Sequence, residues 1–213
     1  MKKLAIFDLD GTILETLEDL YRSVDYALTK NNLPTRTKSE VRAFVGNGIR
    51  NLMIRSCPEG ADEKVVDKVH ETFLSHYKVH KADNTAPYEG IQSLLYNLKK
   101  KGYLLAVASN KDDGAVKELC KKFFPDLFDV ELGNCPDITR KPAPDALFYI
   151  MDTLGVDAKN TVYVGDSEVD ILTAQNANIP CITVLWGFRD KDYLLSVGAK
   201  TCAETVIELE NLL

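Results

Sequence analysis

The chain has 213 residues, a formal net charge of −6 and the composition of an ordinary globular protein. The negative charge argues against nucleic acid or an anionic membrane as the main partner, and no apolar stretch approaches the length of a membrane span. None of the five cysteines forms a Cys-x-x-Cys pair, so we expect reduced cysteines in a cytoplasmic protein. An anionic substrate would need local cations or a metal ion.

The chain opens with a short apolar run, Leu4 to Phe7, which is typical of a strand buried on both faces. The run stops on Asp8-Leu9-Asp10-Gly11-Thr12. An extended chain sends Asp8 and Asp10 to the same side, at the strand end where open α/β sheets bind their ligands. Two carboxylates this close favour a hard cation held by oxygen. Taken alone, the same residues also fit a surface turn.

Residues from about Glu15 to Ala82 show helical periodicity and no strand pattern. Apolar side chains between residues 17 and 28 recur on one face, and Asn31, Asn32 and Pro34 end this helix. Further helices are expected at residues 39–45, 49–56 and 62–80. We therefore predict a helical domain at residues 16–82, inserted into a core made of residues 1–15 and 83–213.

Beyond the helical block, strand and helix patterns alternate along the chain. Helices are expected at residues 91–101, 114–123, 144–154, 168–177 and 206–213, and strands at 103–108, near 130, at 161–164 and at 180–185. This alternation predicts an α/β core, a doubly wound, Rossmann-like parallel sheet with helices on both faces.

Polar residues suited to one chemistry follow three of the predicted strands, and a lysine precedes a predicted helix. They are Asp8 and Asp10, then Ser109 and Asn110, then Asp166 and Asp170, and Lys141 within Arg140-Lys141-Pro142. Each alone has an ordinary explanation as a turn, a helix cap or a solvated surface residue. Their repeated placement at strand ends and loops favours a single site.

On these residues the chain resembles the haloacid dehalogenase (HAD) superfamily of phosphohydrolases. All four family motifs are present: Asp8-Leu9-Asp10-Gly11-Thr12, Ser109, Lys141 and Gly165-Asp166-Ser167-Glu168-Val169-Asp170. The inserted helices are similar to the family's first type of cap domain, C1. Three further stretches resemble bacterial phosphoglycolate phosphatases and close relatives, namely Phe44-Val45-Gly46-Asn47-Gly48, Pro87-Tyr88-Glu89-Gly90 and Trp186-Gly187-Phe188-Arg189.

The resemblance implies a Mg²⁺-dependent phosphatase that works through an aspartyl-phosphate. It makes Asp8 the nucleophile, a role open to a carboxylate, and Asp10 the general acid and base. The metal ligands would be the side chains of Asp8 and Asp166 and the backbone carbonyl of Asp10. Asp170, one helical turn beyond Asp166, would stand behind them and hold metal waters or Lys141.

Ser109 and Lys141 would hold the phosphoryl oxygens, with Thr12 and Asn110 as further phosphate-binding residues. In the cap, Gly46, Asn47 and Gly48 form a candidate substrate-contact loop, and Arg50 could meet a second anionic group. A plain interhelical turn explains the glycines equally well. Position 15 is Glu where many relatives carry Asp, a departure that concerns substrate fit and not phosphoryl chemistry.

We therefore expect hydrolysis of a small phosphorylated metabolite in the cytoplasm, with 2-phosphoglycolate as the leading substrate. Pyrophosphate, sugar phosphates and nucleoside monophosphates are alternatives, and a β-phosphoglucomutase-like phosphotransferase uses the same core. From a different class, a phospho-acceptor receiver module lacks an inserted helical domain, and a non-catalytic phosphate-binding protein lacks support because all catalytic positions match. The oligomeric state, monomer or homodimer, stays open.

All three histidines lie in the long helix expected at residues 62–80. His76 and His80 are four residues apart, so they share a face and could in principle bind a metal ion. There is no His-Glu-x-x-His pattern and no evident third ligand. Packing or solvent-facing roles are therefore favoured for these histidines.

Overall fold

The structure, a computed structural model, describes residues 2–213, which divide into two compact units. An α/β unit comprises Met1–Leu14 and Pro87–Leu213, and a helical unit comprises Glu15–Ala86. Sequence patterns placed the two boundaries after residues 15 and 82, whereas the structure divides after residues 14 and 86. Two short strands at these crossings, β2 (Leu14–Glu15) and β3 (Ala86–Pro87), pair as a two-stranded sheet.

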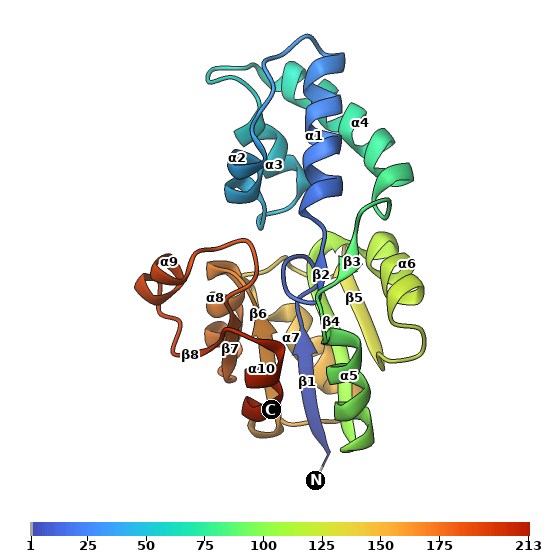
Figure 1. The fold of residues 1–213 in the computed structure, drawn as a ribbon, viewed down its shortest axis with the longest axis vertical. Coiled ribbons are helices and arrows are strands. Elements are labelled where there is room, and N and C mark those ends of the chain that lie inside the picture. The colour runs from blue at the N-terminus through green and yellow to red at the C-terminus, as the bar shows by residue number, and fades with distance from the viewer. Residues whose placement is uncertain (1) are drawn as a thin grey trace. The chain divides into compact units, whose positions relative to one another are not determined.

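The α/β unit is built on a six-stranded sheet with the order β5-β4-β1-β6-β7-β8 (Figure 1). In chain order the strands are β1 (Lys3–Phe7), β4 (Tyr103–Asp112), β5 (Val130–Asn134), β6 (Thr161–Gly165), β7 (Cys181–Val184) and β8 (Thr201–Ala203). β1 pairs in parallel with β4 and β6, and parallel pairing continues to both edges. The predicted α/β fold class is confirmed.

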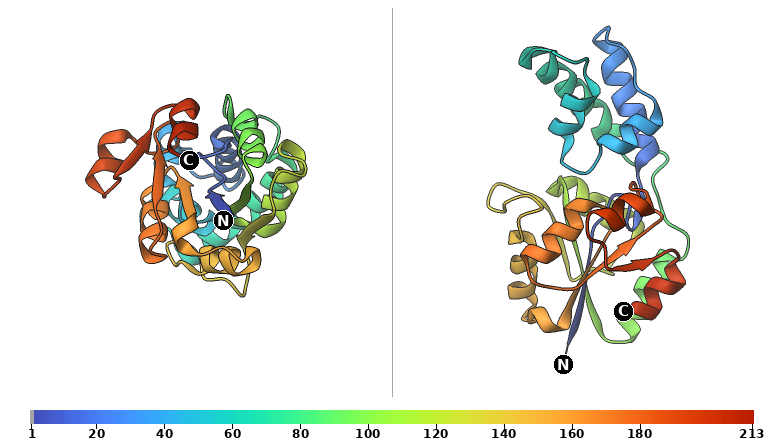
Figure 2. Two further views of the ribbon diagram at one scale, coloured as in Figure 1. Left: turned by 90° about the horizontal axis from the view of Figure 1, so that it is seen from below. Right: turned by 90° about the vertical axis from the view of Figure 1, so that its left-hand side faces the viewer.

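Helices cover both faces of this sheet (Figure 2). They are α5 (Ile91–Lys100), α6 (Asp113–Phe123), α7 (Asp145–Leu154), α8 (Glu168–Asn176), α9 (Lys191–Ser196) and α10 (Val206–Leu212), with a 3₁₀ helix at Ala158–Asn160. Leu4 and Ile6 of β1 belong to a buried cluster with residues of α7 and α8. The alternation of side chains along a strand turns Ala5 and Phe7 to the other face. All four are fully buried, as expected for a central strand.

Several elements differ from the sequence prediction. The strand expected to stop at residue 108 runs on to Asp112, with its pairing to β5 interrupted between Ala108 and Asp112. β2, β3, β8, α9 and the 3₁₀ helix were not predicted. Each has six residues or fewer, which is too short for a periodic apolar pattern to emerge.

The helical unit contains α1 (Leu17–Lys30), α2 (Lys38–Phe44), α3 (Ile49–Ser56) and α4 (Glu63–His80). Thr37 and Glu40 form a capping box at the start of α2, and the Asp62 carboxylate caps α4. The buried face of α4 carries Val66, Val69, Phe73 and Tyr77. Among the described residues, no helix is long and apolar enough to cross a membrane.

Asp19, in the first turn of α1, ties the two ends of the helical unit together. Although Asp19 is only 2% exposed, its carboxylate accepts hydrogen bonds from the backbone N–H and side chain of both Asn84 and Thr85, at 2.7–3.0 Å. Burial raises the pKa of this carboxyl, but the donors from Asn84 and Thr85 outweigh burial and lower the pKa below its ordinary value. The chain therefore leaves the helical unit next to where it entered.

Candidate active site

Asp8 and Lys141 form the centre of a buried polar cluster at the carboxyl end of β1. The ammonium of Lys141 lies 2.9 Å from Asp8 Oδ1, 2.8 Å from Asp170 Oδ1 and 2.8 Å from the hydroxyl of Tyr163. The Lys141 side chain is 4% exposed. Because its two carboxylate partners favour the charged form, the pKa of Lys141 is raised despite burial.

Asp170 is held by donors on both of its oxygens. Oδ1 accepts from Lys141 and from the Tyr163 hydroxyl, the latter at 2.9 Å. Oδ2 accepts from the Asp166 N–H at 3.2 Å and from the N–H and hydroxyl of Ser167 at 3.1 and 2.6 Å. Burial raises the pKa of Asp170, but the charge of Lys141 and these hydrogen bonds lower it by more. The pKa of Asp170 therefore lies below its ordinary value. Asp170 is therefore an ionised anchor for Lys141 and the start of α8.

The Asp166 carboxylate lies between two glycine backbones. A Cβ atom at Gly11, which has a φ of +85°, would come within 2.5 Å of Asp166 Oδ2, and one at Gly187 within 2.3 Å of the same oxygen. The carboxylate accepts from the Thr12 hydroxyl at 3.2 Å and the Phe188 N–H at 2.7 Å. Glycine at both positions thus leaves room for this carboxylate at the end of β6.

Asp8, Asp166 and Asp170 each offer a carboxylate oxygen, and these oxygens lie within 4.8 Å of one another. Burial raises the pKa of Asp8 to about 7, against the opposing charge of Lys141. Burial, followed by the charges of Asp170 and Asp8, raises the pKa of Asp166 well above its ordinary value. The Lys141 ammonium contacts two of these three close carboxylates, those of Asp8 and Asp170. This oxygen-rich donor set fits a hard divalent cation.

Asp10 has a partner that sequence reasoning missed. The Lys111 ammonium lies 2.9 and 3.1 Å from the two oxygens of Asp10, and the Lys111 side chain is 3% exposed. Lys111 stands two residues after Ser109 in β4, so the period of a strand could have placed both on one side. Tyr163 was also missed, because a tyrosine within an apolar strand usually indicates packing.

The family profile of haloacid dehalogenase-like hydrolases matches residues 5–184. The chain belongs to this family. Proteins named phosphoglycolate phosphatase are similar to it: that of Colwellia psychrerythraea is 31% identical over 98% of this chain and 95% of its own length. The Haemophilus influenzae protein is 33% identical over 88% of this chain and 87% of its own length.

Solved structures agree with the family assignment. A crystal structure from Lactobacillus delbrueckii subsp. bulgaricus, provisionally named a phosphoglycolate phosphatase, has a TM-score of 0.95 and 36% identity. The alignment covers 100% of this chain and 98% of that one. As a member of the HAD-like hydrolases with such relatives, the chain is a phosphoric monoester hydrolase.

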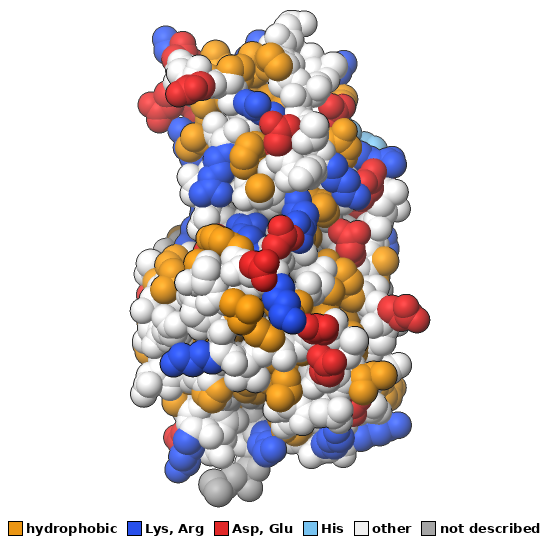
Figure 3. Space-filling view, turned by 60° about the vertical axis from the view of Figure 1, so that its left-hand side comes forward, with side chains coloured by type: hydrophobic (Ala, Val, Ile, Leu, Met, Phe, Trp, Pro, Cys, Tyr) orange, Lys and Arg blue, Asp and Glu red, His pale blue; other side chains and the backbone are white. Residues whose placement is uncertain are grey.

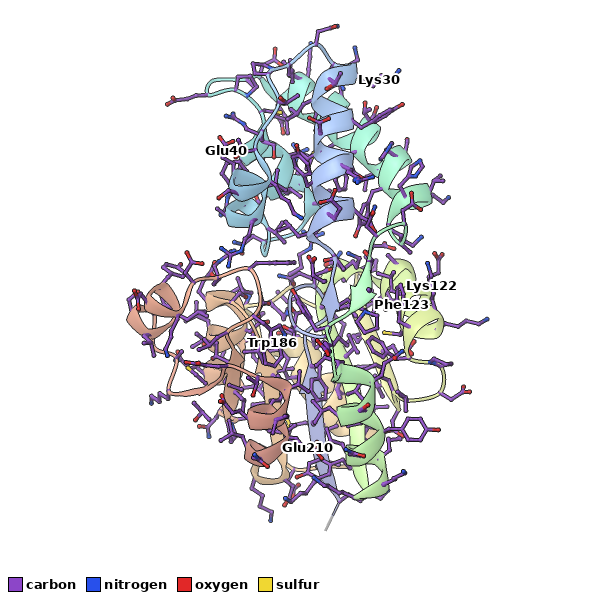
Figure 4. The ribbon with its side chains drawn as sticks, viewed as in Figure 1. Lys30, Glu40, Lys122, Phe123, Trp186 and Glu210 are labelled. Atoms are coloured by element: carbon purple, nitrogen blue, oxygen red, sulfur yellow. The ribbon has the colours of Figure 1, made fainter. Side chains whose placement is uncertain are left out.

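In this HAD-like hydrolase, Asn110 braces the loop that carries Lys141. Its side-chain Oδ1 accepts from the Lys141 N–H at 2.9 Å, and its Nδ2 donates to the Lys141 carbonyl at 3.1 Å. The Ser109 hydroxyl accepts from the Lys111 N–H at 3.3 Å. The Thr12 side chain is fully buried, and its hydroxyl donates to Asp166. The backbone carbonyl of Thr12 accepts from the indole of Trp186 at 3.0 Å. Trp186 is labelled in the α/β unit in Figure 4.

The predicted specificity residues lie in the helical unit. Gly48, with a φ of +81°, precedes the first turn of α3, and the Asn47 carbonyl accepts from the Asn51 side chain at 2.8 Å. Arg50 forms ion pairs with Asp67 and Glu63 of the same unit. Their role in substrate contact stays a prediction, as does that of Gly46. The Glu15 carboxylate accepts from the Leu17 N–H at 3.1 Å, at the start of α1.

Proposed function

We propose that this HAD-like hydrolase is a Mg²⁺-dependent phosphatase that acts on a small phosphate monoester, with 2-phosphoglycolate as the leading substrate, through a phosphorylated Asp8. The observation that carries the proposal is the buried Asp8 carboxylate, 2.9 Å from the Lys141 ammonium and close to Asp166 and Asp170. A nucleophile, a phosphate-binding cation and a candidate cation site thus meet at one strand end.

The side chains of Asp8 and Asp166 and the backbone carbonyl of Asp10 would hold the metal ion. Asp170 is the weaker candidate because donors already occupy both of its oxygens. Oxygen ligands alone favour Mg²⁺ over softer metals. The bound ion supplies positive charge that keeps Asp8 ionised and stabilises charge on the phosphoryl group.

In the first half-reaction, an Asp8 oxygen forms a bond to phosphorus while the bond from phosphorus to the ester oxygen breaks. Asp10 acts as the general acid and gives a proton to the departing oxygen, so the alcohol leaves neutral. Lys141 and the Ser109 hydroxyl hold the phosphoryl oxygens as their charge grows. The products of this step are the free alcohol and a phosphorylated Asp8.

In the second half-reaction, a water molecule attacks phosphorus and the bond to Asp8 breaks. Asp10, now a carboxylate, removes a proton from that water, and inorganic phosphate leaves. Both aspartates return to their starting protonation states. The Lys111 ammonium beside Asp10 positions its carboxylate for these two transfers.

The names of the relatives favour 2-phosphoglycolate over other esters. The helical unit would act as a C1 cap that selects the substrate and excludes water, with residues 46–48 and Arg50 as its contact candidates. Since small changes in a cap alter the substrate without altering the core chemistry, the substrate is a separate question from the mechanism.

The test is phosphate release from a panel of esters with Mg²⁺, for wild type, Asp8→Asn and the control Asp157→Asn. Asp157 is an exposed aspartate of the same unit. We expect 2-phosphoglycolate to be turned over fastest, the control to match wild type, and Asp8→Asn to be reduced at least ~10³-fold. A phosphorylated Asp8 peptide should be recovered after acid quenching of the wild type.

The outcomes separate the parts of the proposal. An Asp8→Asn enzyme as fast as wild type would overturn the mechanism. Faster turnover of pyrophosphate, a hexose phosphate or a nucleotide would overturn only the substrate assignment. Isomerisation of a sugar phosphate without net phosphate release would identify a mutase instead.

A further inference from the structure

The loop at residues 186–189, between β7 and α9, packs on the Asp166 carboxylate. The backbone N–H of Phe188 donates to Asp166 Oδ2 at 2.7 Å. A Cβ atom at Gly187 would come within 2.3 Å of the same oxygen, so the loop backbone approaches this closely only because position 187 is glycine. One oxygen of Asp166 is therefore held by the backbone of the 186–189 loop.

A second contact joins the loop to the other oxygen of Asp166 through Thr12. The Trp186 indole donates to the Thr12 carbonyl at 3.0 Å, and the Thr12 hydroxyl donates to Asp166 Oδ1 at 3.2 Å. The Tyr88 ring lies 6.3 Å from the Trp186 ring, centroid to centroid. Because Trp186 is the single tryptophan of the chain, its fluorescence reports the position of this loop.

The end of the loop is anchored by a largely buried ion pair. The Arg189 guanidinium donates from Nε to Glu168 Oε2 at 2.7 Å and from Nη2 to Glu168 Oε1 at 3.2 Å. The Arg189 side chain is 9% exposed, unlike the acidic and basic side chains that lie next to one another on the molecular surface in Figure 3. Glu168 is the first residue of α8, two positions after Asp166. The pair therefore ties the loop to the helix that follows Asp166.

The two charges of this pair act on a cation near Asp166 in opposite directions. Burial raises the pKa of Asp166 most, and the nearby charge of Arg189 is among the effects that lower it. By charge alone, removing Arg189 would strengthen cation binding and removing Glu168 would weaken it. Loss of an anchor for the loop would instead weaken cation binding in both cases. The sign of the effect therefore distinguishes the two explanations.

We propose that Arg189 and Glu168 are positioning residues for Asp166, and that their ion pair holds the 186–189 loop against the Asp166 carboxylate. Their role rests on the proposed function, in which Asp166 is a metal ligand. The Phe188 N–H occupies one lone pair of Oδ2 and fixes the direction in which the carboxylate offers its remaining lone pairs. The loop thus orients a ligand before the metal ion arrives.

The test is binding of Mn²⁺, a probe that prefers oxygen ligands and whose free form is counted by electron paramagnetic resonance, with Mg²⁺ as competitor. Asp166→Asn identifies the binding that belongs to this site. We expect Arg189→Met and Glu168→Gln each to weaken this binding by ~10-fold, although they change the local charge in opposite directions. Lys191→Met is the matched control and should bind as wild type, because Lys191 pairs with Glu204 at an exposed position just beyond the loop.

A second measurement needs neither metal nor turnover. In the metal-free protein, Arg189→Met and Glu168→Gln should shift the Trp186 emission to longer wavelength and increase its quenching by acrylamide, because the loop detaches. Lys191→Met should leave both properties unchanged. The double variant should lose no more Mn²⁺ affinity than either single variant, since the two residues form one contact. Circular dichroism checks that each variant folds.

Two results would overturn the positioning role and leave the metal site intact. One is tighter Mn²⁺ binding in Arg189→Met with weaker binding in Glu168→Gln, the pattern of charge alone. The other is unchanged Mn²⁺ binding and unchanged Trp186 emission in both variants. Wild-type Mn²⁺ binding that Mg²⁺ does not displace and Asp166→Asn does not remove would overturn the proposed metal site, and the positioning role with it.

Discussion

Asp19 of the helical unit and Asp166 of the α/β unit are both 2% exposed, yet their surroundings are opposite. Asp19 receives hydrogen bonds from two backbone N–H groups and two side chains, and its pKa is lowered. Asp166 receives two hydrogen bonds and faces two carboxylates, and its pKa is raised. A buried carboxylate with enough donors stabilises a fold, whereas one with too few donors requires a cation.

Among the variants that test this comparison of Asp19 with Asp166, the largest effect should come from Asp166→Asn. Turnover at saturating Mg²⁺ should fall by ~10²–10³-fold, the range for losing one charge-stabilising group. The metal-free variant should nevertheless be at least as stable as wild type, because a repelling carboxylate is removed. Phosphate release and urea unfolding in EDTA measure the two quantities. A variant with lower metal-free stability would mean that Asp166 is structural, like Asp19.

Asp10 is intermediate between Asp19 and Asp166, because one ammonium group, that of Lys111, contacts its carboxylate. Lys111→Met should reduce kcat/KM for an alkyl phosphate by ~10²-fold through misplacement of Asp10. Turnover of p-nitrophenyl phosphate should change less, since its leaving group needs little protonation. Lys117→Met is the control, because Lys117 is an exposed lysine that pairs with Asp113. Equal losses on both esters would contradict a role through Asp10.

Asp19→Asn should lower the free energy of unfolding by about 2 kcal/mol, because an amide group would face donors and leave them unsatisfied. Asp25→Asn, at a half-buried position of the same helix, should change stability by less than about 0.5 kcal/mol. Urea unfolding measures both. Equal effects at the two positions would mean that the hydrogen bonds to Asn84 and Thr85 add nothing.

The smallest expected effect is a difference in pH dependence. The pKa of Asp19 is lowered on folding, so its contribution is present above its unfolded pKa and is lost as the pH falls through its folded pKa. The pKa of Asp8 is raised to about 7 without metal, so its contribution is present below its unfolded pKa and is lost as the pH rises towards 7.

In EDTA, stability should therefore fall between about pH 4 and pH 7 relative to Asp8→Asn. Asp19→Asn should differ most from wild type above pH 4 and converge with it in acid. Urea unfolding at a series of pH values measures how the stability difference between wild type and each variant changes with pH. A metal-free wild type whose stability relative to Asp8→Asn rises over this range would contradict the assignment for Asp8.

The sequence predicted what is local and repeated. The apolar run before Asp8, the alternation of strands and helices, and the motif residues at strand ends led to the fold and to most of the α/β site. Asp19 was missed because an acidic residue in the first turn of a helix is already explained by the helix dipole. Its partners Asn84 and Thr85 are 65 and 66 residues away, and no local pattern links them.

The same reason explains the other omissions. Lys111 contacts Asp10, which is 101 residues away in the sequence. Tyr163 contacts Lys141 from a strand whose apolar sequence indicates packing only. On α4, steps of four residues back from Tyr77 lead through Phe73 and Val69 to Val65, but the buried side chain is that of Val66, and Val65 is half-buried. A four-residue spacing approximates the helical period of 3.6, so a predicted face drifts along a long helix.

The double hydrogen bond from Asn110 to the backbone of Lys141 has a consequence for local opening of the chain. The Lys141 amide is protected from solvent by a side chain and not by a helix or a strand. Its hydrogen-exchange rate should therefore report how often the loop detaches from the end of β4, independently of global unfolding. A single amide signal would thus record the fraction of time for which the ammonium is in place.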